Sequence, residues 1–212
     1  MLVLNFEGER NMKEIEIRTI IKDVDKNEII KHLLEEGYEL TKDVIQHDIM
    51  FDKEDASLFR GGSKIRLRIE GNKKELTYKG SLLESDVVSR RTELNFPMDS
   101  SSKEDIEAFM TAIGYPLCFQ IKKHRIVYSK GDVSVSFDEW PIIGCMLEIE
   151  GSEEEIINLS RIIAPNYEFG NRRLKDFFAD KMKETGKTLE ELKALYEKET
   201  GFDLGKIELV VL

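Results

Sequence analysis

Charged and apolar residues alternate strictly in a short stretch near the start of this chain, Glu14-Ile15-Glu16-Ile17-Arg18. A period of two residues is that of a β-strand, on which successive side chains point to opposite faces. The charged residues of the stretch therefore share one face of a strand, and the isoleucines share the other. A single stretch of this kind usually marks the solvent-exposed face of a half-buried strand.

The same alternation of charged and apolar residues recurs at four later places, which gives five stretches in all. The charged residues of these stretches are Lys64, Arg66, Arg68 and Glu70; Arg91 and Glu93; Lys123 and Arg125; and Glu148 and Glu150. Because the sets mix acidic and basic side chains, we interpret them as strands that curl and place their charged faces inside. The apolar faces then point outwards and are covered by helices. Such an interior suits a phosphate chain held through divalent metal ions.

The order of the expected elements predicts an α+β fold. Turn residues and helix caps divide the chain as β-α-β-β-β-β-α-β-β-β-α, followed by further helices. The resulting strands, about eight, are enough to close a barrel with a usable interior. We therefore predict a closed antiparallel eight-stranded barrel with helices packed outside. Its expected parts are an N-terminal extension (1–12), the barrel domain (13–183) and a helical C-terminal appendage (184–212).

Three expectations concern the ends of helices and of the chain. Asp25 is the expected N-cap of the first helix, and Ser152 and Thr188 begin later helices with a glutamate three residues on, the spacing of a capping box. The residues Ile207–Val211 form either a last short strand or an apolar end packed on the body.

Charge and composition limit the partners and the compartment. The 212-residue chain has a net charge of −10, which argues against general nucleic-acid binding but is compatible with a local basic pocket. Cys118 and Cys145 lie in apolar runs and are expected to be buried free thiols. No apolar run approaches the ~18 residues of a membrane span, and no signal peptide is apparent. We expect a cytoplasmic protein without a membrane partner.

Taken together, these motifs resemble the CYTH superfamily, the triphosphate tunnel metalloenzymes, which includes class IV adenylyl cyclases, thiamine triphosphatases and inorganic triphosphatases. The family opens with Glu-x-Glu-x-Lys, where this chain has Glu14-x-Glu16-x-Arg18. The resemblance covers about residues 13–180. It continues through Asp52, Arg66-x-Arg68, Thr77-x-Lys79-Gly80, Arg91-x-Glu93, Lys123-x-Arg125, Asp138 and Glu148-x-Glu150. It implies an antiparallel eight-stranded tunnel, in agreement with the inward-charge interpretation.

The resemblance also implies roles for these residues. Carboxylates would hold Mg²⁺ or Mn²⁺, because hard cations prefer oxygen ligands and are coordinated by protein carboxylates and substrate phosphates together. The metal ligands implied are Glu14, Glu16, Glu148 and Glu150, with Asp138 and Glu93 either holding a second metal or orienting a basic neighbour. The phosphate-binding residues implied are Arg18, Arg66, Arg68, Lys79, Arg91, Lys123 and Arg125, with Arg172 carried over from a C-terminal motif. Glu16, Arg18 and Lys79 are the expected catalytic residues.

Two departures from the family pattern bear on catalysis. Arg18 stands where the family has a lysine, and Met50 stands where hydrolytic members that resemble this chain have a tyrosine paired with that lysine. Arginine stays protonated and does not readily serve as a base, and methionine cannot replace a phenol. The resemblance therefore still implies triphosphate binding. The two departures remove the lysine and tyrosine by which those members usually activate water.

Three functions follow from the resemblance. The first is metal-dependent hydrolysis of an inorganic or organic triphosphate, in which water attacks in line. The second is the class IV adenylyl cyclase reaction, in which the ribose 3′-hydroxyl of ATP replaces water and pyrophosphate leaves. The third is a polyphosphate or nucleotide sensor with little turnover. The expected partner is a small molecule that contains a triphosphate, and a homodimer is a further possibility.

Restoring the family pair tests the importance of the two departures. We expect the double variant Arg18→Lys with Met50→Tyr to raise the maximal rate of tripolyphosphate hydrolysis more than either single change, because paired groups act as one unit. Steady-state kinetics of the four proteins measure this effect. If the double variant is no faster than the wild type, the missing pair does not limit the rate.

Overall fold

A computed structural model describes residues 13–81, 83–84, 89–170 and 174–211 of the chain. The expected N-terminal extension (1–12) lies outside these residues. The strands are β1 (Lys13–Ile21), β2 (Glu39–Phe51), β3 (Lys64–Glu70), β4 (Lys73–Lys79), β5 (Leu83–Glu84), β6 (Ser89–Pro97), β7 (Leu117–Lys130), β8 (Val133–Trp140) and β9 (Gly144–Glu150). The helices are α1 (Asp23–Glu35), α2 (Ser57–Arg60), α3 (Lys103–Ala112), α4 (Glu153–Ile163), α5 (Leu174–Thr185), α6 (Leu189–Thr200) and α7 (Glu208–Val211).

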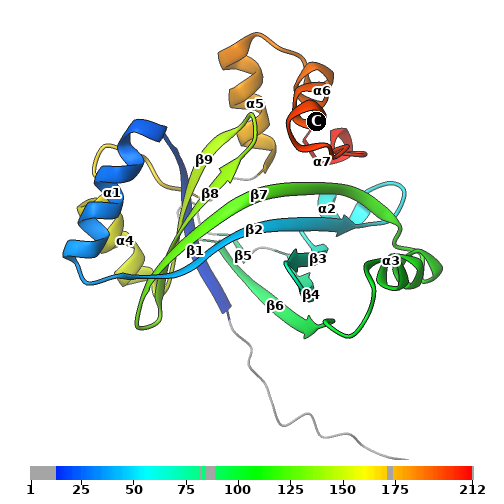
Figure 1. The fold of residues 1–212 in the computed structure, drawn as a ribbon, viewed down its shortest axis with the longest axis horizontal. Helices are drawn as coiled ribbons and strands as arrows, with labels where there is room; N and C mark the ends of the chain where they lie inside the picture. Colours follow the sequence, from blue (N-terminus) through cyan, green and yellow to red (C-terminus); the bar gives the residue numbers. More distant parts are fainter. Residues whose placement is uncertain (1–12, 82, 85–88, 171–173, 212) are drawn as a thin grey trace, which may run out of the picture.

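The strands form one antiparallel sheet in the order β1-β9-β8-β7-β2-β3-β4-β6-β5. An additional antiparallel pairing joins β1 to β6, through Lys13–Glu16 and Ser89–Thr92. The α+β class and the antiparallel arrangement are confirmed. The described sheet has nine strands, one more than expected, because the two-residue strand β5 pairs with β6. Figure 1 shows β2 and β7 as long curved strands, with α1 and α4 on one side, α3 on another and α5–α7 over one end.

The first apolar cluster lies between the outer face of the sheet and helices α1 and α4. Ile17 of β1 and Ile149 of β9 are register partners, and both are buried in this cluster with Leu33 of α1 and Ile156 of α4. These isoleucines occupy the apolar positions of the alternating stretches. The expectation that the apolar faces point outwards beneath helices is therefore confirmed for these strands. On another side, α3 covers β2 and β3 in the same way, with Ile106 packed against Ile49.

The predicted start of the first helix is wrong by three residues. Helix α1 begins at Asp23, and its N-cap Lys22 makes no side-chain capping bond. The expected cap, Asp25, instead accepts a hydrogen bond from the hydroxyl of Tyr167, which ties α1 to the segment after α4. The predicted capping boxes at Ser152 and Thr188 are both present.

The C-terminal helices pack against one end of the sheet (Figure 1). Phe177, Leu192 and Tyr196 share an apolar cluster with Phe119 of β7. The Tyr196 hydroxyl accepts a hydrogen bond from the backbone N–H of Lys122 at 2.5 Å and donates one to the Lys122 carbonyl at 3.1 Å. This polar contact fixes α6 on β7. Within the described residues, no helix is long and apolar enough to cross a membrane.

The last residues return to β7 through a close backbone approach at Gly205. The N–H of Lys206 donates to the Cys118 carbonyl at 2.8 Å, and a Cβ added at Gly205 would lie only 2.7 Å from that oxygen. Ile207 is fully buried, and Glu208–Val211 form the short helix α7. The apolar-end expectation is therefore confirmed, and the strand alternative is wrong. Cys118 and Cys145 are buried and free, as predicted.

We expect Gly205→Ala to lower the free energy of unfolding by about 3 kcal/mol, near the upper end of ordinary single substitutions. Its φ of +62° is unfavourable for an L-residue, and the added Cβ would also press on the backbone of β7. Gly201→Ala is the matched control, because Gly201 has a φ of +72° with nothing within 4 Å of an added Cβ. It should lose only about 1 kcal/mol. Urea unfolding followed by circular dichroism measures both, and equal losses would contradict the close approach.

Candidate functional site inside the curved sheet

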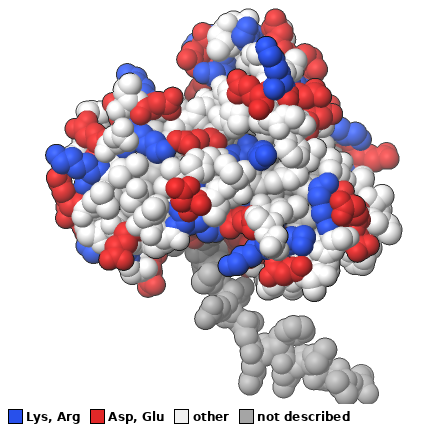
Figure 2. Space-filling model, viewed as in Figure 1, with Lys and Arg blue, Asp and Glu red and all other residues white. Residues whose placement is uncertain are grey.

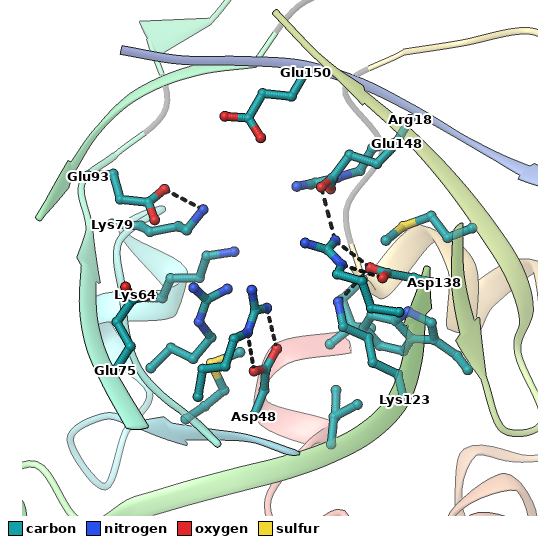
Figure 3. Close-up of a pocket in the computed structure, with 18 of the residues that line it drawn as sticks. Arg18, Asp48, Lys64, Glu75, Lys79, Glu93, Lys123, Asp138, Glu148 and Glu150 are labelled. Carbon is teal, nitrogen blue, oxygen red and sulfur yellow. Dashed lines mark hydrogen bonds and ion pairs between the residues drawn. The ribbon is translucent and has the colours of Figure 1, made fainter. Parts of the chain in front are cut away.

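A cavity of about 660 Å³ lies inside the curve of the sheet, where strands surround it on several sides (Figure 3). Its charged lining consists of Arg18, Asp48, Lys64, Arg66, Arg68, Glu75, Lys79, Glu93, Lys123, Arg125, Asp132, Asp138, Glu148, Glu150 and Glu155. Figure 3 shows labelled residues from opposite sides, such as Lys79 and Glu148, pointing towards the same central space. On the face of the molecule drawn in Figure 2, by contrast, acidic and basic side chains are intermingled.

The strand register places opposite charges directly across from one another. Arg18 of β1 faces Glu148 of β9, and Asp48 of β2 faces Arg68 of β3. Arg125 of β7 likewise faces Asp138 of β8, and Lys79 of β4 faces Glu93 of β6. Side chains in such cross-strand positions are close neighbours on one face of a sheet. The alternation in the sequence and the pairing of the strands together therefore assemble the cavity lining.

Arg18 joins two of the predicted metal ligands. One of its terminal nitrogens (Nη2) lies 2.5 Å from Oε2 of Glu16, and its Nε lies 2.6 Å from Oε2 of Glu148. Arg125 Nη2 contacts the other oxygen of Glu148 at 3.0 Å. Burial alone would raise the pKa of Glu148, but Arg18 and then Arg125 hold it well below its usual value. Glu148 is therefore ionised, and its negative charge is shared between two guanidinium groups.

Asp138 holds two further cations in the buried wall of the cavity. Its Oδ2 lies 2.5 Å from Lys123 Nζ and 2.7 Å from Arg125 Nη2, and its Oδ1 lies 2.5 Å from Arg125 Nε. Burial, followed by the repulsion of Arg125, lowers the pKa of Lys123 to about 8. Both oxygens of Asp138 are thus engaged by cations. This residue was predicted as a metal ligand or as the partner of a basic neighbour, and the contacts found here are of the second kind.

Asp48 lines the cavity and is absent from the predicted site residues. Its carboxylate receives a bidentate pair of hydrogen bonds from Arg68, with Nε–Oδ1 and Nη2–Oδ2 distances of 2.8 Å. Burial would raise its pKa, but the Arg68 guanidinium holds the pKa well below its usual value. The available signal was its spacing, two residues before Met50 on the same strand. Glu75 and Asn95 also line the cavity and were not singled out, whereas Lys64 was expected on an inward charged face and does line the cavity.

Arg66 is the least satisfied cation of the lining. It is buried with 7% of its surface exposed, and its Nη2 donates only a long 3.3 Å bond to Thr77 Oγ1. Its Nε has no hydrogen-bond partner among the residues that the structure describes. Burial, followed by the nearby positive charge of Arg68, lowers its pKa. A buried guanidinium with an unused donor is well suited to accept an anion.

The cavity also has an apolar part, which the sequence analysis did not predict. Its lining includes Met50, Phe59, Phe119, Ile121, Trp140, Met146, Leu174 and Phe177. Several of these residues belong to the cluster beneath the C-terminal helices. Trp140 adjoins the charged part, since Lys123 Nζ lies 5.3 Å from the centre of its ring. The cavity therefore presents a charged wall and an apolar wall to one space.

Some predicted residues cannot be assigned a place in the cavity. Glu14 and Arg91 are register partners on β1 and β6, but their side chains lie outside the described part of the structure. Arg172 is also outside the described residues. Asp52, named among the family motifs, caps the turn that leads into α2, where its carboxylate accepts hydrogen bonds from the backbone of Leu58 and Phe59.

The carboxylates on β1 and β9 have the chemistry of a divalent-metal site. Glu16 and Glu150 are register partners, and Glu148 lies two residues away, so the set offers oxygen ligands only. Among the described residues, no three carboxylate, histidine or cysteine side chains are grouped closely enough to form a metal site as they stand. Arg18 forms ion pairs with Glu16 and Glu148, and its Nε donates a hydrogen bond to Glu148. The oxygen ligands of these glutamates therefore fit Mg²⁺ or Mn²⁺. In the structure, Arg18 is the partner of two of them, Glu16 and Glu148.

Comparison with known proteins places the chain in a family. The model of the CYTH domain matches residues 12–165, and the chain belongs to this family. A curated relative is a protein of Methanocaldococcus jannaschii named as a candidate adenylate cyclase, MJ0240. It is 28% identical over 152 residues, which are 72% of this chain and 84% of that protein.

Solved structures share the fold. The PH1012 protein of Pyrococcus horikoshii has a TM-score of 0.58 at 22% identity, and the match covers 73% of this chain and 94% of that one. A Hippeastrum protein, HpAC1, has a TM-score of 0.60 at 18% identity over 83% and 97% of the two chains. That protein is described as a candidate adenylyl cyclase with a dominant triphosphatase activity.

We expect Asp138→Asn to lower the free energy of unfolding by about 3 kcal/mol, because it leaves Lys123 and Arg125 buried without their shared counter-charge. Asp43→Asn is the control. Asp43 pairs with His124 on the outer surface and has 56% of its side chain exposed, so the loss should stay below about 1 kcal/mol. Chemical unfolding of both variants measures the difference. Adding tripolyphosphate should restore part of the loss in Asp138→Asn, and similar losses in both variants would argue against a buried charge cluster.

Proposed function

We propose that this protein binds the triphosphate group of a small molecule inside the cavity and hydrolyses it in a metal-dependent reaction. The observation that carries this proposal is the convergence of arginines and lysines from several strands on one cavity of about 660 Å³. We also propose that the β1–β6 pairing closes the sheet into a tunnel around this space. The CYTH relationship supports the same class of substrate.

In this proposal, the basic side chains bind and orient the phosphates. Arg68 and Arg125 are held by Asp48 and Asp138, so their guanidinium groups are already positioned before the ligand arrives. Arg66 has a donor that no described residue satisfies. Preorganised donors of this kind cost no reorganisation when negative charge develops in the reaction. Lys79 and Lys123 add point charges on opposite sides of the cavity, as Figure 3 shows.

Carboxylates would hold the metal and orient water. Glu16, Glu148 and Glu150 would hold Mg²⁺ or Mn²⁺, and the bound cation would supply positive charge that neutralises the phosphates. Arg18 remains protonated and stabilises negative charge without acting as a base. We assign the orientation of the attacking water to a carboxylate of this group, with Glu16 as the first candidate. Lys79 would then stabilise the departing phosphate.

The adenylyl cyclase reaction is the second candidate, and one structural feature favours it. The apolar wall formed by residues such as Met50, Trp140 and Phe177 suits an organic group attached to the triphosphate, and not inorganic tripolyphosphate alone. The named relative from Methanocaldococcus jannaschii points the same way. In that reaction the nucleophile is the substrate's own hydroxyl, so the enzyme need not activate water.

One set of assays separates the candidates. Purified protein would be supplied with tripolyphosphate, ATP and thiamine triphosphate, each with Mg²⁺ or Mn²⁺. Release of phosphate supports hydrolysis, whereas cyclic AMP with pyrophosphate supports the cyclase reaction. Tight binding without any product supports the third function, a sensor. Absence of both binding and turnover for all three compounds would reject the proposal.

We expect Glu16→Gln and Glu150→Gln to lower metal-dependent turnover at least about tenfold, because each variant removes a charged oxygen ligand. Part of the loss should be recovered at higher Mn²⁺ concentrations if metal affinity is the cause. Glu139→Gln is the control. Glu139 pairs with Lys26 and His124 outside the described cavity lining, so turnover should stay close to wild type. Unchanged turnover in both the Glu16 and the Glu150 variant would remove these glutamates from the metal site.

A further inference from the structure

Arg18 connects two carboxylates that come from neighbouring strands. Its Nη2 contacts Glu16 on its own strand at 2.5 Å, and its Nε contacts Glu148 on β9 at 2.6 Å. The side chains of Glu16 and Glu148 are only 1% and 8% exposed, whereas that of Arg18 is 18% exposed. One guanidinium therefore supplies counter-charge to two buried carboxylates, and Arg125 is a second partner of Glu148 alone.

The chemistry of arginine makes this double contact possible. A guanidinium presents N–H donors from separate nitrogens in a rigid plane, and so it contacts two carboxylates at once. A lysine ammonium at the same position is a single point charge at the end of a flexible stem. The departure from the Glu-x-Glu-x-Lys pattern thus changes which cation the two glutamates face before any ligand binds.

The backbone at Arg18 is held in place while the side chain borders the cavity. Arg18 pairs with β9 on one side, and its N–H and carbonyl each form a 3.1 Å hydrogen bond with Gly170 on the other. The backbone of the strand is therefore held on both sides, and a change of partner at Arg18 would involve its side chain alone. Since Arg18 lines the cavity that Arg66 and Arg125 also line, a bound triphosphate lies within the reach of its guanidinium.

We propose that Arg18 is a resident counter-ion, which blocks Glu16 and Glu148 until a triphosphate draws its guanidinium away. Arg18 then pairs with phosphate oxygens, and the two carboxylates become available to a divalent cation. Metal and triphosphate therefore bind cooperatively, and the protein without triphosphate has a low metal affinity. This inference rests on the proposed function, because it takes Glu16 and Glu148 as metal ligands.

Cooperativity of this kind is reciprocal. If the triphosphate raises the affinity for the metal by some factor, the metal must raise the affinity for the triphosphate by the same factor. The coupling should depend on Arg18 specifically and not on the total positive charge of the cavity. Arg68 provides the comparison, because it lines the same cavity but pairs with Asp48 instead of with the glutamates.

Binding of Mn²⁺ in the absence of substrate tests the proposal. Electron paramagnetic resonance or calorimetric titration would compare the wild type with Arg18→Gln, Arg18→Lys and Arg68→Gln. We expect Arg18→Gln to bind Mn²⁺ roughly tenfold more tightly, because an opposing charge near the carboxylates is removed. Arg18→Lys should be intermediate, since it keeps the charge but loses the double contact. Arg68→Gln should change the affinity by less than about threefold, because Arg68 does not contact the glutamates.

The same titrations with a non-hydrolysable imido analogue of tripolyphosphate measure the coupling. The analogue should raise Mn²⁺ affinity strongly in the wild type and much less in Arg18→Gln. Unchanged or weaker Mn²⁺ binding by Arg18→Gln, or an equal gain in Arg68→Gln, would overturn the inference. Circular dichroism verifies that each variant is folded, and Arg18→Lys provides the test if Arg18→Gln is not.

The outcomes also distinguish this inference from the proposed function. If the wild type hydrolyses triphosphates but Mn²⁺ affinity does not respond to Arg18, only the inference fails. If the wild type binds neither Mn²⁺ nor the tripolyphosphate analogue, the proposed function fails, and the inference fails with it.

Discussion

Ion pairs between neighbouring strands allow this sheet to keep charges in its interior. Moving a charged side chain out of water is expensive unless an opposite charge with good hydrogen-bond geometry replaces the lost hydration. The register provides such partners for Arg68 at Asp48 and for Arg125 at Asp138. A one-residue slip of any strand would turn its charged face outwards and its isoleucines inwards. The positions of the cations therefore depend on the same pairings that hold the sheet together.

The outer layer follows from this arrangement of the interior. Because the charged faces point inwards, the apolar faces need other cover, which α1 and α4 supply over Ile17 and Ile149. The C-terminal helices have a different role, since they cover an end where the inward positions have become apolar, as at Phe119 and Met146. The cavity thus owes its charged wall to alternation within strands, and its apolar wall to apolar inward positions at one end of those strands together with Leu174 and Phe177 of α5.

Much of the fold was predictable from the sequence, because the two-residue period determines which face each side chain occupies. The strands, the outward apolar faces and the capping box at Ser152 follow from local pattern alone. The partners inside the cavity do not, because cross-strand register depends on turns and bulges. The irregularity between Met50 and Phe51 in the β2–β7 pairing is one example. Asp48 was missed for this reason, since nothing near it in the sequence indicates that it faces Arg68.

Several side chains have partners in the structure that the order of residue types along the sequence does not specify. Asp25 is a residue type that commonly caps helices, but its carboxylate instead accepts a hydrogen bond from Tyr167, which is distant in the sequence. Arg18 was expected to contact phosphate, and the register with Glu148 also gives it two carboxylate partners. The nine-strand count differs from the expected eight because β5, with two residues, is too short to leave a periodic signal.

The close approach of Gly205 to Cys118 links the segment after α6 to one part of the cavity only. Leu204 and Ile207 of this segment share an apolar cluster with Phe119 and Phe177, which line the cavity. Local opening of a segment requires less free energy than unfolding of the whole protein. A substitution that detaches this segment from β7 should therefore loosen the apolar wall and leave the charged wall, which cross-strand ion pairs hold, in place.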